Sequence, residues 1–258
     1  MLIDTHAHLY LKEFEADLPE VISAAKQKGV EKILLPNIDS TTIDALNNMC
    51  HQYPEYCYPM MGLHPGSVNQ DYKKELEIIK EEIDRGSYIA IGEIGIDLYW
   101  DSTYLKEQIA AFELQIDWAK ELELPIVIHA RDSFAEIFQV LDKKIDDKLF
   151  GVFHCFTGEM AEVEKILNYK NFMFGIGGIL TFKNAGLDKI VKDIPLNKVI
   201  LETDAPYLSP VPFRGKRNQS SYVHYIAEKL AEINEVTLSQ IIEQTGKNAT
   251  ELFNLASE

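Results

Sequence analysis

Short apolar runs alternate with longer amphipathic segments along most of the chain. The apolar runs have the length of strands, whereas the segments between them repeat their apolar residues at the spacing of a helix. Ile109 and Phe112, for example, fall on one face of the helical segment 102–121. We expect strands at residues 2–9, 32–38, 58–64, 88–95, 125–131, 150–156, 172–178 and 199–205.

Glycines and one candidate cap mark the ends of the expected helices. One helical pattern ends at Gly29, and another begins after Asp71 and ends at Gly86. Eight strands that alternate with helices in 258 residues match a (β/α)8 TIM barrel, an α/β fold. The competing fold, an open doubly wound sheet, usually has a glycine-rich loop after its first strand. Residues 2–14 contain no glycine, which favours the barrel.

The C-terminal part of the chain holds two further helical patterns after residue 220. The first completes the barrel, and residues 237–253 are expected to be appended helices that cover the barrel's outside. No Ser/Gly-rich linker or internal repeat divides the chain. We therefore expect a single domain over residues 1–258.

The composition is that of an ordinary soluble protein, with 46% apolar and 26% charged residues. No apolar run is long enough to cross a bilayer, and the first run begins at Leu2 without a basic region before it. The three cysteines do not make a disulfide framework. We therefore expect a cytoplasmic protein with no membrane association, and we infer no obligate protein partner.

The net charge of −16 limits the ways in which the protein could bind nucleic acid. A broad surface that grips a duplex is normally basic, so the acidic balance argues against one. It leaves room for a local site where metal ions and a few arginines supply positive charge.

Ionisable side chains interrupt six of the expected strands near their C-terminal ends. Such side chains are rarely buried in strands unless they are paired or bind a metal. A single pair fits hydrogen-bonded core histidines as well as it fits a metal site. In a barrel, however, the C-terminal strand ends meet at one face, where active sites lie. The residues are His6, His8, His64, Glu93, His129, His154, Glu202 and Asp204.

Imidazoles and carboxylates at these positions predict a metal centre. Such a set is too large for one tetrahedral ion and suits two ions with open positions, which Glu93 could bridge. Imidazole-rich ligation favours Zn or Mn, and Mg remains an alternative at the carboxylate-rich end. The six expected ligands are His6, His8, Glu93, His129, His154 and Asp204.

Seven motifs, taken in order and spacing, carry a resemblance that covers nearly the whole chain. They are IDTHAHL at 3–9, GLHP at 62–65, GEIGID at 92–97, PIVIHAR at 125–131, FHCFTG at 153–158, ETDAPYL at 202–208 and FRGKRN at 213–218. With these motifs the chain resembles the TatD-type metal-dependent deoxyribonucleases, part of a wider superfamily of metal-dependent hydrolase barrels. One departure is RGKRNQS, where relatives commonly read RGKRNEP.

The resemblance implies two overlapping sets of metal ligands. His6, His8 and Asp204 would hold one ion together with Glu93, and Glu93 would also join His129 and His154 around the second. Many amidohydrolase relatives instead bridge their metals with a carboxylated lysine on the fourth strand. This chain has Glu93 and no lysine there.

We expect a divalent-metal-dependent nuclease in which two ions activate a water that attacks a DNA phosphodiester bond. Asp204 and Glu93 are the expected catalytic residues, and Glu202 is expected to hold a ligand imidazole or pair with an arginine. His64, Arg131 and Arg214 are the expected contacts to a single-stranded DNA end. Action as a 3′–5′ exonuclease is implied by the resemblance only.

Two other functions remain open. One is a metal-dependent deacylase or amidohydrolase that acts on a modified RNA or on a small ester or amide. The other is a metal-binding scaffold without catalysis, which the full ligand set disfavours. Tyr99 and Trp100 either stack on bases or pack under a loop, and Cys155 is expected to point away from its neighbour His154 as a small core residue.

Overall fold

Eight parallel strands form the centre of the computed structural model, which describes residues 1–99 and 101–255. They pair in sequence order as two sheets, β1-β2-β3 and β4-β5-β6-β7-β8. The strands are β1 Leu2–Asp4, β2 Val30–Pro36, β3 Cys57–Met60, β4 Ile91–Asp97, β5 Ile126–Arg131, β6 Gly151–Phe153, β7 Phe172–Ile176 and β8 Val199–Leu201.

The two sheets meet at both of their edges. At one seam a parallel bridge joins Met61 to Ile91, and at the other a parallel bridge joins Ala7 to Ala205. Backbone hydrogen bonds extend the second seam, where the amide of Thr5 donates to the carbonyl of Leu201 over 3.0 Å. The fold is therefore the expected (β/α)8 TIM barrel, with shorter strands than the apolar runs suggested.

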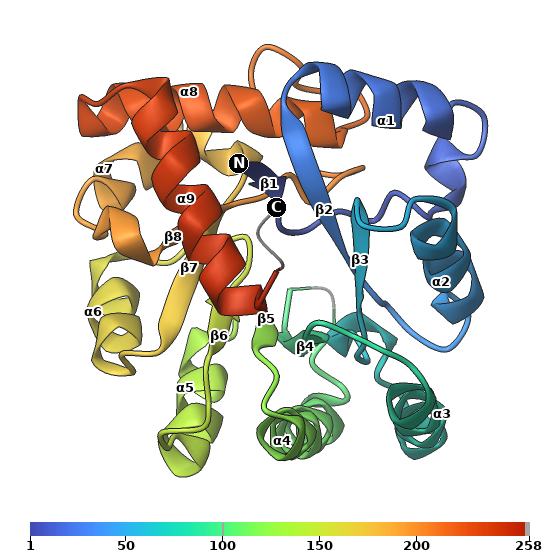
Figure 1. Ribbon diagram of the computed structural model, residues 1–258. Helices are drawn as coiled ribbons and strands as arrows, with labels where there is room; N and C mark the ends of the chain where they lie inside the picture. Colours follow the sequence, from blue (N-terminus) through green and yellow to red (C-terminus); the bar gives the residue numbers. More distant parts are fainter. Residues whose placement is uncertain (100, 256–258) are drawn as a thin grey trace.

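Helices surround the strands in a ring, and one further helix lies across an end of the barrel (Figure 1). The helices are α1 Leu18–Gln27, α2 Ile43–Gln52, α3 Tyr72–Arg85, α4 Leu105–Leu122, α5 Phe134–Lys144, α6 Met160–Asn168, α7 Leu187–Val191, α8 Val223–Asn234 and α9 Leu238–Phe253. Short 3-10 turns occur at Lys12–Phe14, Pro65–Ser67, Gly178–Thr181, Leu196–Lys198 and Ser220–Tyr222. No helix in the described ranges is both long and apolar enough to cross a membrane.

The expectation that residues 237–253 cover the barrel's outside is wrong. They form the single helix α9, which packs against the inward-facing strand residues at the end where the strands begin (Figure 1). Asn248 of α9 donates to the carbonyl of Val199 over 2.7 Å, at the start of β8. At Gly246 a Cβ atom would lie 2.0 Å from the carbonyl oxygen of Met1, so only glycine permits this approach.

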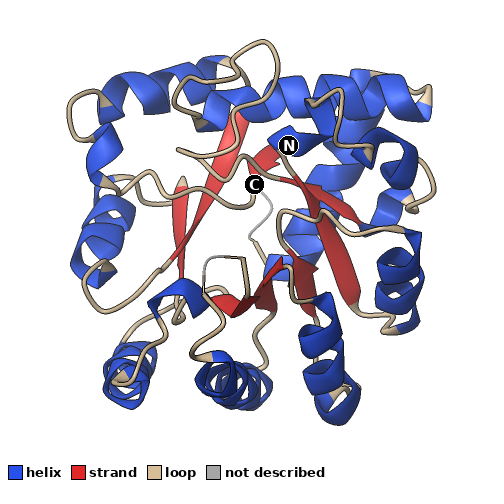
Figure 2. Ribbon diagram, turned by 180° about the vertical axis from the view of Figure 1, so that it is seen from behind, coloured by secondary structure: helices blue, strands red, loops and turns tan. Residues whose placement is uncertain are grey.

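The barrel interior is an apolar cluster that α9 closes. One apolar side chain from most strands points inward, and Leu252 and Phe253 of α9 pack below them. The opposite end, where the strands finish, is covered by loops (Figure 2). The fold therefore leaves the C-terminal strand ends for chemistry. The inward residues are Ile3, Leu34, Met60, Val127, Val152 and Ile200 of the strands and Ala90, just before β4.

Candidate metal centre

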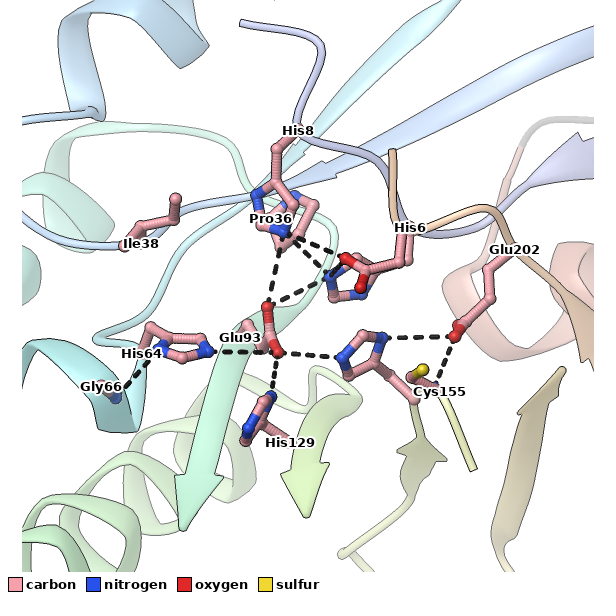
Figure 3. A network of polar contacts seen from close by, with 12 residues as sticks. His6, His8, Pro36, Ile38, His64, Gly66, Glu93, His129, Cys155 and Glu202 are labelled. Carbon is pink, nitrogen blue, oxygen red and sulfur yellow. Dashed lines mark hydrogen bonds and ion pairs between the residues drawn. The ribbon is translucent and has the colours of Figure 1, made fainter. Parts of the chain in front are cut away.

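The carboxylate of Glu93 lies at the centre of a ring of imidazoles at the C-terminal end of the barrel (Figure 3). Its Oε2 is 3.1 Å from Nε2 of His6 and 3.7 Å from Nε2 of His8. Its Oε1 is 2.7 Å from Nδ1 of His129 and 3.0 Å from Nε2 of His154. The structure thus brings together groups that are up to 148 positions apart, since the pairs run from residue 6 to residue 154.

Glycines on β4 allow this strand to press Glu93 against its neighbours. At Gly92 a Cβ atom would lie 2.6 Å from Cβ of Val127, on β5. Gly95 has a φ of +144°, and a Cβ atom there would lie 2.1 Å from the carbonyl oxygen of His129. The close approach of β4 to β5 is what places Glu93 beside His129, and it explains the glycines of the GEIGID motif.

Asp204 completes the Oε2 side of the ring. Its Oδ1 lies 3.7 Å from Nε2 of His8 and 4.0 Å from Nε2 of His6. Its amide donates to the carbonyl of His6 over 2.8 Å, and Asp4 of β1 accepts hydrogen bonds from the amide and hydroxyl of Thr203 at 2.8 and 2.7 Å. These bonds hold the end of β8 against the end of β1, so Asp204 shares its side of Glu93 with the first two histidines.

The hydrogen bond on the outer nitrogen of His8 determines where its proton lies. The hydroxyl of Tyr10 donates to the carbonyl of Pro36 over 2.6 Å, so its oxygen accepts from Nδ1 of His8 over 2.9 Å. The proton of a neutral His8 is then on Nδ1, which leaves the lone pair of Nε2 directed at the centre. That is the tautomer a metal ligand needs.

A carboxylate lies beside the outer nitrogen of His129 and another beside that of His154. Nε2 of His129 lies 2.9 Å from Oδ2 of Asp97, and Nδ1 of His154 lies 3.3 Å from Oε1 of Glu202. Asp97 accepts the outer N–H of His129, which leaves its Nδ1 as the nitrogen that would bind a cation. Glu202 lies within ion-pair distance of Nδ1 of His154 but makes no hydrogen bond to it. This donor set fits divalent ions, because imidazole nitrogens from several strands face one carboxylate.

His64 differs from the other histidines of the ring. Its Nδ1 accepts the amide N–H of Gly66 over 2.9 Å, so the proton of a neutral His64 is on Nε2. Nε2 lies 3.5 Å from Oε1 of Glu93. By distance alone His64 groups with Glu93 and His129 as a possible ligand. Its tautomer makes it a hydrogen-bond donor toward the cavity instead.

The pKa values of the ring histidines shift in two directions. Burial lowers those of His6 and His8, whereas at His129 and His154 the neighbouring carboxylates outweigh burial and raise the pKa. Burial, with the nearby His154, lowers the pKa of His6 to about 4, so His6 is neutral at pH 7. Burial raises the pKa of Asp204 to about 7, because the carboxylate loses water. Asp204 therefore holds a proton part of the time at neutral pH until a cation displaces it.

The ring opens into a cavity of about 800 Å³ at the barrel's end. Arg131 lines it, and its guanidinium carbon lies 3.7 Å from the ring centroid of Tyr99. Tyr99 thus packs against an arginine at the cavity mouth, whereas Trp100 lies outside the described residues. Arg214 is absent from the described lining of this cavity and lies instead over the ring of Phe182, at 3.6 Å.

The expectation for Cys155 is wrong. Cys155 lines the metal cavity and is only partly buried. β6 ends at Phe153, and Cys155 has a φ of +45°, so the alternation of strand faces does not extend to it. Its amide instead donates to Glu202, the residue that also contacts His154.

Two residues of the centre escaped the sequence analysis. Tyr10 follows His8 by two positions, and Asp97 ends the GEIGID motif at the last position of β4. Both positions carried a signal, since i and i+2 share a strand face and Asp97 closes a strand beside Glu93. Neither signal says that the side chain holds an imidazole rather than facing solvent.

Comparison with known proteins places the chain in a family. Residues 3–254 match the family model for TatD-related DNases. The chain is 41% identical to the Bacillus subtilis protein named uncharacterized metal-dependent hydrolase YabD, over 99% of this chain and 100% of that protein. It is 30% identical to the 3′-5′ ssDNA/RNA exonuclease TatD of Pectobacterium carotovorum, over 99% and 100%.

A solved structure agrees with the family match. The crystal structure of YJJV, a TatD homologue from Escherichia coli K12, superposes with a TM-score of 0.92 at 26% identity and covers 99% of this chain and 98% of its own. The family model spans almost the whole chain, and the matched residues include those that form the ring around Glu93. The chain belongs to the TatD-related DNase family.

Proposed function

We propose that the protein is a divalent-metal-dependent hydrolase that cleaves phosphodiester bonds of nucleic acid, acting as a 3′–5′ exonuclease on single-stranded DNA ends. The observation that carries the proposal is the position of Glu93 between two groups of imidazoles, one on each carboxylate oxygen. This arrangement suits two cations that share a bridging carboxylate. β4, Ile91–Asp97, contains no lysine that could bridge the metals in its place.

Each proposed ligand is assigned to an ion by the carboxylate oxygen of Glu93 that it faces. His6, His8 and Asp204 are the proposed partners of Glu93 for one ion, because they surround its Oε2. His129 and His154 surround its Oε1 and are the proposed partners for the other. The imidazole-rich set favours Zn or Mn over Mg.

Divalent ions, when bound, supply the positive charge that lowers the pKa of a water and offsets the charge of the phosphodiester. Asp204 is the proposed acceptor of the attacking water's proton, since it borders the cavity and its pKa is raised to about 7 by burial. Glu93 fixes the spacing of the two ligand groups. Both residues therefore carry catalytic roles in the proposal.

Two cavity residues are the proposed contacts to the reacting phosphate. His64 directs an Nε2–H donor into the cavity, as its bond from Gly66 requires. Arg131 presents a planar guanidinium to the same cavity, and such a group binds phosphate oxygens through paired N–H donors. One donor and one cation beside the metals are enough to orient a single phosphodiester.

The relatives support a nucleic-acid substrate. The Pectobacterium protein is named as an exonuclease for single-stranded DNA and RNA, and its similarity to this chain runs end to end. The net charge of −16 favours a single-stranded end over a long duplex, because a duplex needs a wide basic surface. The cytoplasm remains the predicted location, and residues 1–258 remain a predicted single domain.

The decisive assay uses single-stranded DNA labelled at its 5′ end and protein reconstituted with Mn²⁺ or Zn²⁺. We expect a ladder that shortens from the 3′ end, and we expect no cleavage in excess chelator or with His129→Ala. His51→Ala, on the exposed end of α2, is the matched control and should cleave normally. Metal bound without DNA cleavage, together with turnover of an acyl ester, would instead support the deacylase.

A further inference from the structure

The structure has a second cavity of about 420 Å³. Two segments of the chain contribute residues to the lining of both this cavity and the metal cavity. Ile179 and Leu208 face the metal cavity, and Phe182 and Val211, three residues further along each segment, face the second one. The amide of Val211 donates to the hydroxyl of Thr181 over 2.9 Å and ties the segments together. The second cavity is lined by Phe182, Lys183, Asn184, Ala185, Val211 and Arg214.

The charge of this lining is opposite to that of the chain as a whole. It holds Lys183 and Arg214 and, within the described residues, no acidic side chain. The groove between α3 and α4, by contrast, mixes its lysines with Glu77, Glu81 and Asp84. In a chain of net charge −16, a cationic lining without acids favours an anionic ligand.

Arg214 is held in a form that can contact both a base and a phosphate. Its guanidinium carbon lies 3.6 Å from the ring centroid of Phe182, so the ring supports the guanidinium plane. In the described ranges no carboxylate pairs with Arg214. Arg217 of the same loop, by contrast, donates two hydrogen bonds to the carboxylate of Asp17 at 2.8 and 2.6 Å.

One segment that lines both cavities carries two exposed apolar side chains. Tyr207, which lines the metal cavity, is 50% exposed, and Val211, which lines the second cavity, is 44% exposed. Aromatic rings and arginine planes are the surfaces on which unpaired bases stack. Tyr207, Val211 and the supported guanidinium of Arg214 lie along one segment and offer surfaces for the bases and phosphates of a single strand.

We propose that the Phe182–Arg214 cavity binds a nucleotide of a single-stranded polynucleotide whose scissile phosphate lies at the metal centre. This subsite rests on the proposed nuclease function and extends it, because it makes the enzyme prefer a strand to a single nucleotide ester. In this proposal Arg214 contacts the substrate, as the sequence predicted. It contacts a neighbouring nucleotide and not the reacting phosphate.

Two substrates distinguish a defect in the subsite from a defect in the metal centre. One is thymidine 5′-(p-nitrophenyl phosphate), which carries a single nucleotide, and the other is an oligodeoxynucleotide of about eight residues. Arg214→Ala and Phe182→Leu should raise KM for the oligonucleotide about tenfold, as expected for one lost stacking contact. The kcat/KM for the nitrophenyl ester should stay unchanged. Arg85→Ala, at the end of α3 where the strands begin, removes the same charge elsewhere and should change neither value.

An unchanged KM for the oligonucleotide in both variants would overturn the subsite, and so would an equal loss on both substrates. If the wild-type protein cleaves neither substrate, the proposed nuclease function fails. The subsite is then tested separately, by the binding of the oligonucleotide. The measurement is then the fluorescence anisotropy of the labelled oligonucleotide with metal-free protein. Weaker binding by Arg214→Ala would uphold the subsite, and equal binding would refute it.

Discussion

His129 bridges two carboxylates: its Nδ1 lies 2.7 Å from Oε1 of Glu93, and its Nε2 lies 2.9 Å from Oδ2 of Asp97. The side chain of Gln108 holds the backbone of Asp97 from α4, accepting from its amide over 2.9 Å. A carboxylate in this position fixes the tautomer and the orientation of a metal-binding imidazole. Asp97 is therefore a positioning residue in our account.

Asp97→Ala should weaken metal binding about 10–100-fold, the usual cost of losing such a partner. Asp97→Asn should lose less, since its amide oxygen still accepts the N–H of His129. Titration of the metal-free variants with Zn²⁺, followed by calorimetry, gives the affinities. Equal affinities for wild type and Asp97→Ala would show that Asp97 does not position His129.

Tyr10→Phe tests the hydroxyl that receives the proton of His8. Without it, the Nδ1–H of His8 and the carbonyl of Pro36 lose their partner in a buried site. We expect the free energy of unfolding of the metal-free protein to fall by about 1–3 kcal/mol, and metal affinity to fall about tenfold. Chemical denaturation and metal titration measure the two effects. A loss of stability with unchanged affinity would limit Tyr10 to a structural role.

The pH dependence of stability tests the buried carboxyl of Asp4. Burial raises the pKa of Asp4 to about 7, so the folded state keeps its proton while the unfolded chain releases it near pH 4. The stability that Asp4 contributes is full below about pH 4 and is lost as the pH rises to about 7. Asp4→Asn removes this term and keeps the shape of the side chain.

The wild-type protein must be compared with Asp4→Asn, because other groups titrate in the same pH range as Asp4. The lowered pKa of His6, caused by burial, gives stability that rises between about pH 4 and 6.5, which opposes the effect of Asp4. The difference in unfolding free energy, wild type minus Asp4→Asn, should fall with pH by at most about 1.4 kcal/mol per unit. Urea denaturation in chelator gives this difference, and a flat or rising difference would contradict the assignment.

Salt dependence tests the size of the nucleic-acid contact. Arg131 and Arg214 are the two cations that we assign to the strand, so about two phosphates should be neutralised on binding. For a single strand this gives a slope of about −1.4 in a plot of log binding constant against log salt. Anisotropy titrations between low and moderate NaCl measure it. A slope steeper than about −4 would require a broad basic surface that the account lacks.

Strand position carried most of what could be predicted about the site. His6, Glu93, His154 and Asp204 each lie near the C-terminal end of an expected strand, and the barrel brings these ends together. The tautomers could not be predicted, because they depend on which atom each outer nitrogen meets. His64 is the example, since the amide of Gly66 makes it a donor.

The errors have equally specific causes. A helical period shows that residues 237–253 form an amphipathic helix but does not show which surface it covers, and α9 covers the end of the barrel. The positive φ of Cys155 is a property of the loop after β6, and no alternation pattern predicts it. The stacking of Arg214 on Phe182 joins residues 32 positions apart in two loops, so it required coordinates.

The most direct test is anomalous diffraction from crystals grown with Mn²⁺ or Zn²⁺. The account predicts two peaks, one beside each carboxylate oxygen of Glu93, with His6 and His8 at the first and His129 and His154 at the second. A single peak, or metal bound away from Glu93, would contradict the two-ion centre on which the proposed hydrolysis depends.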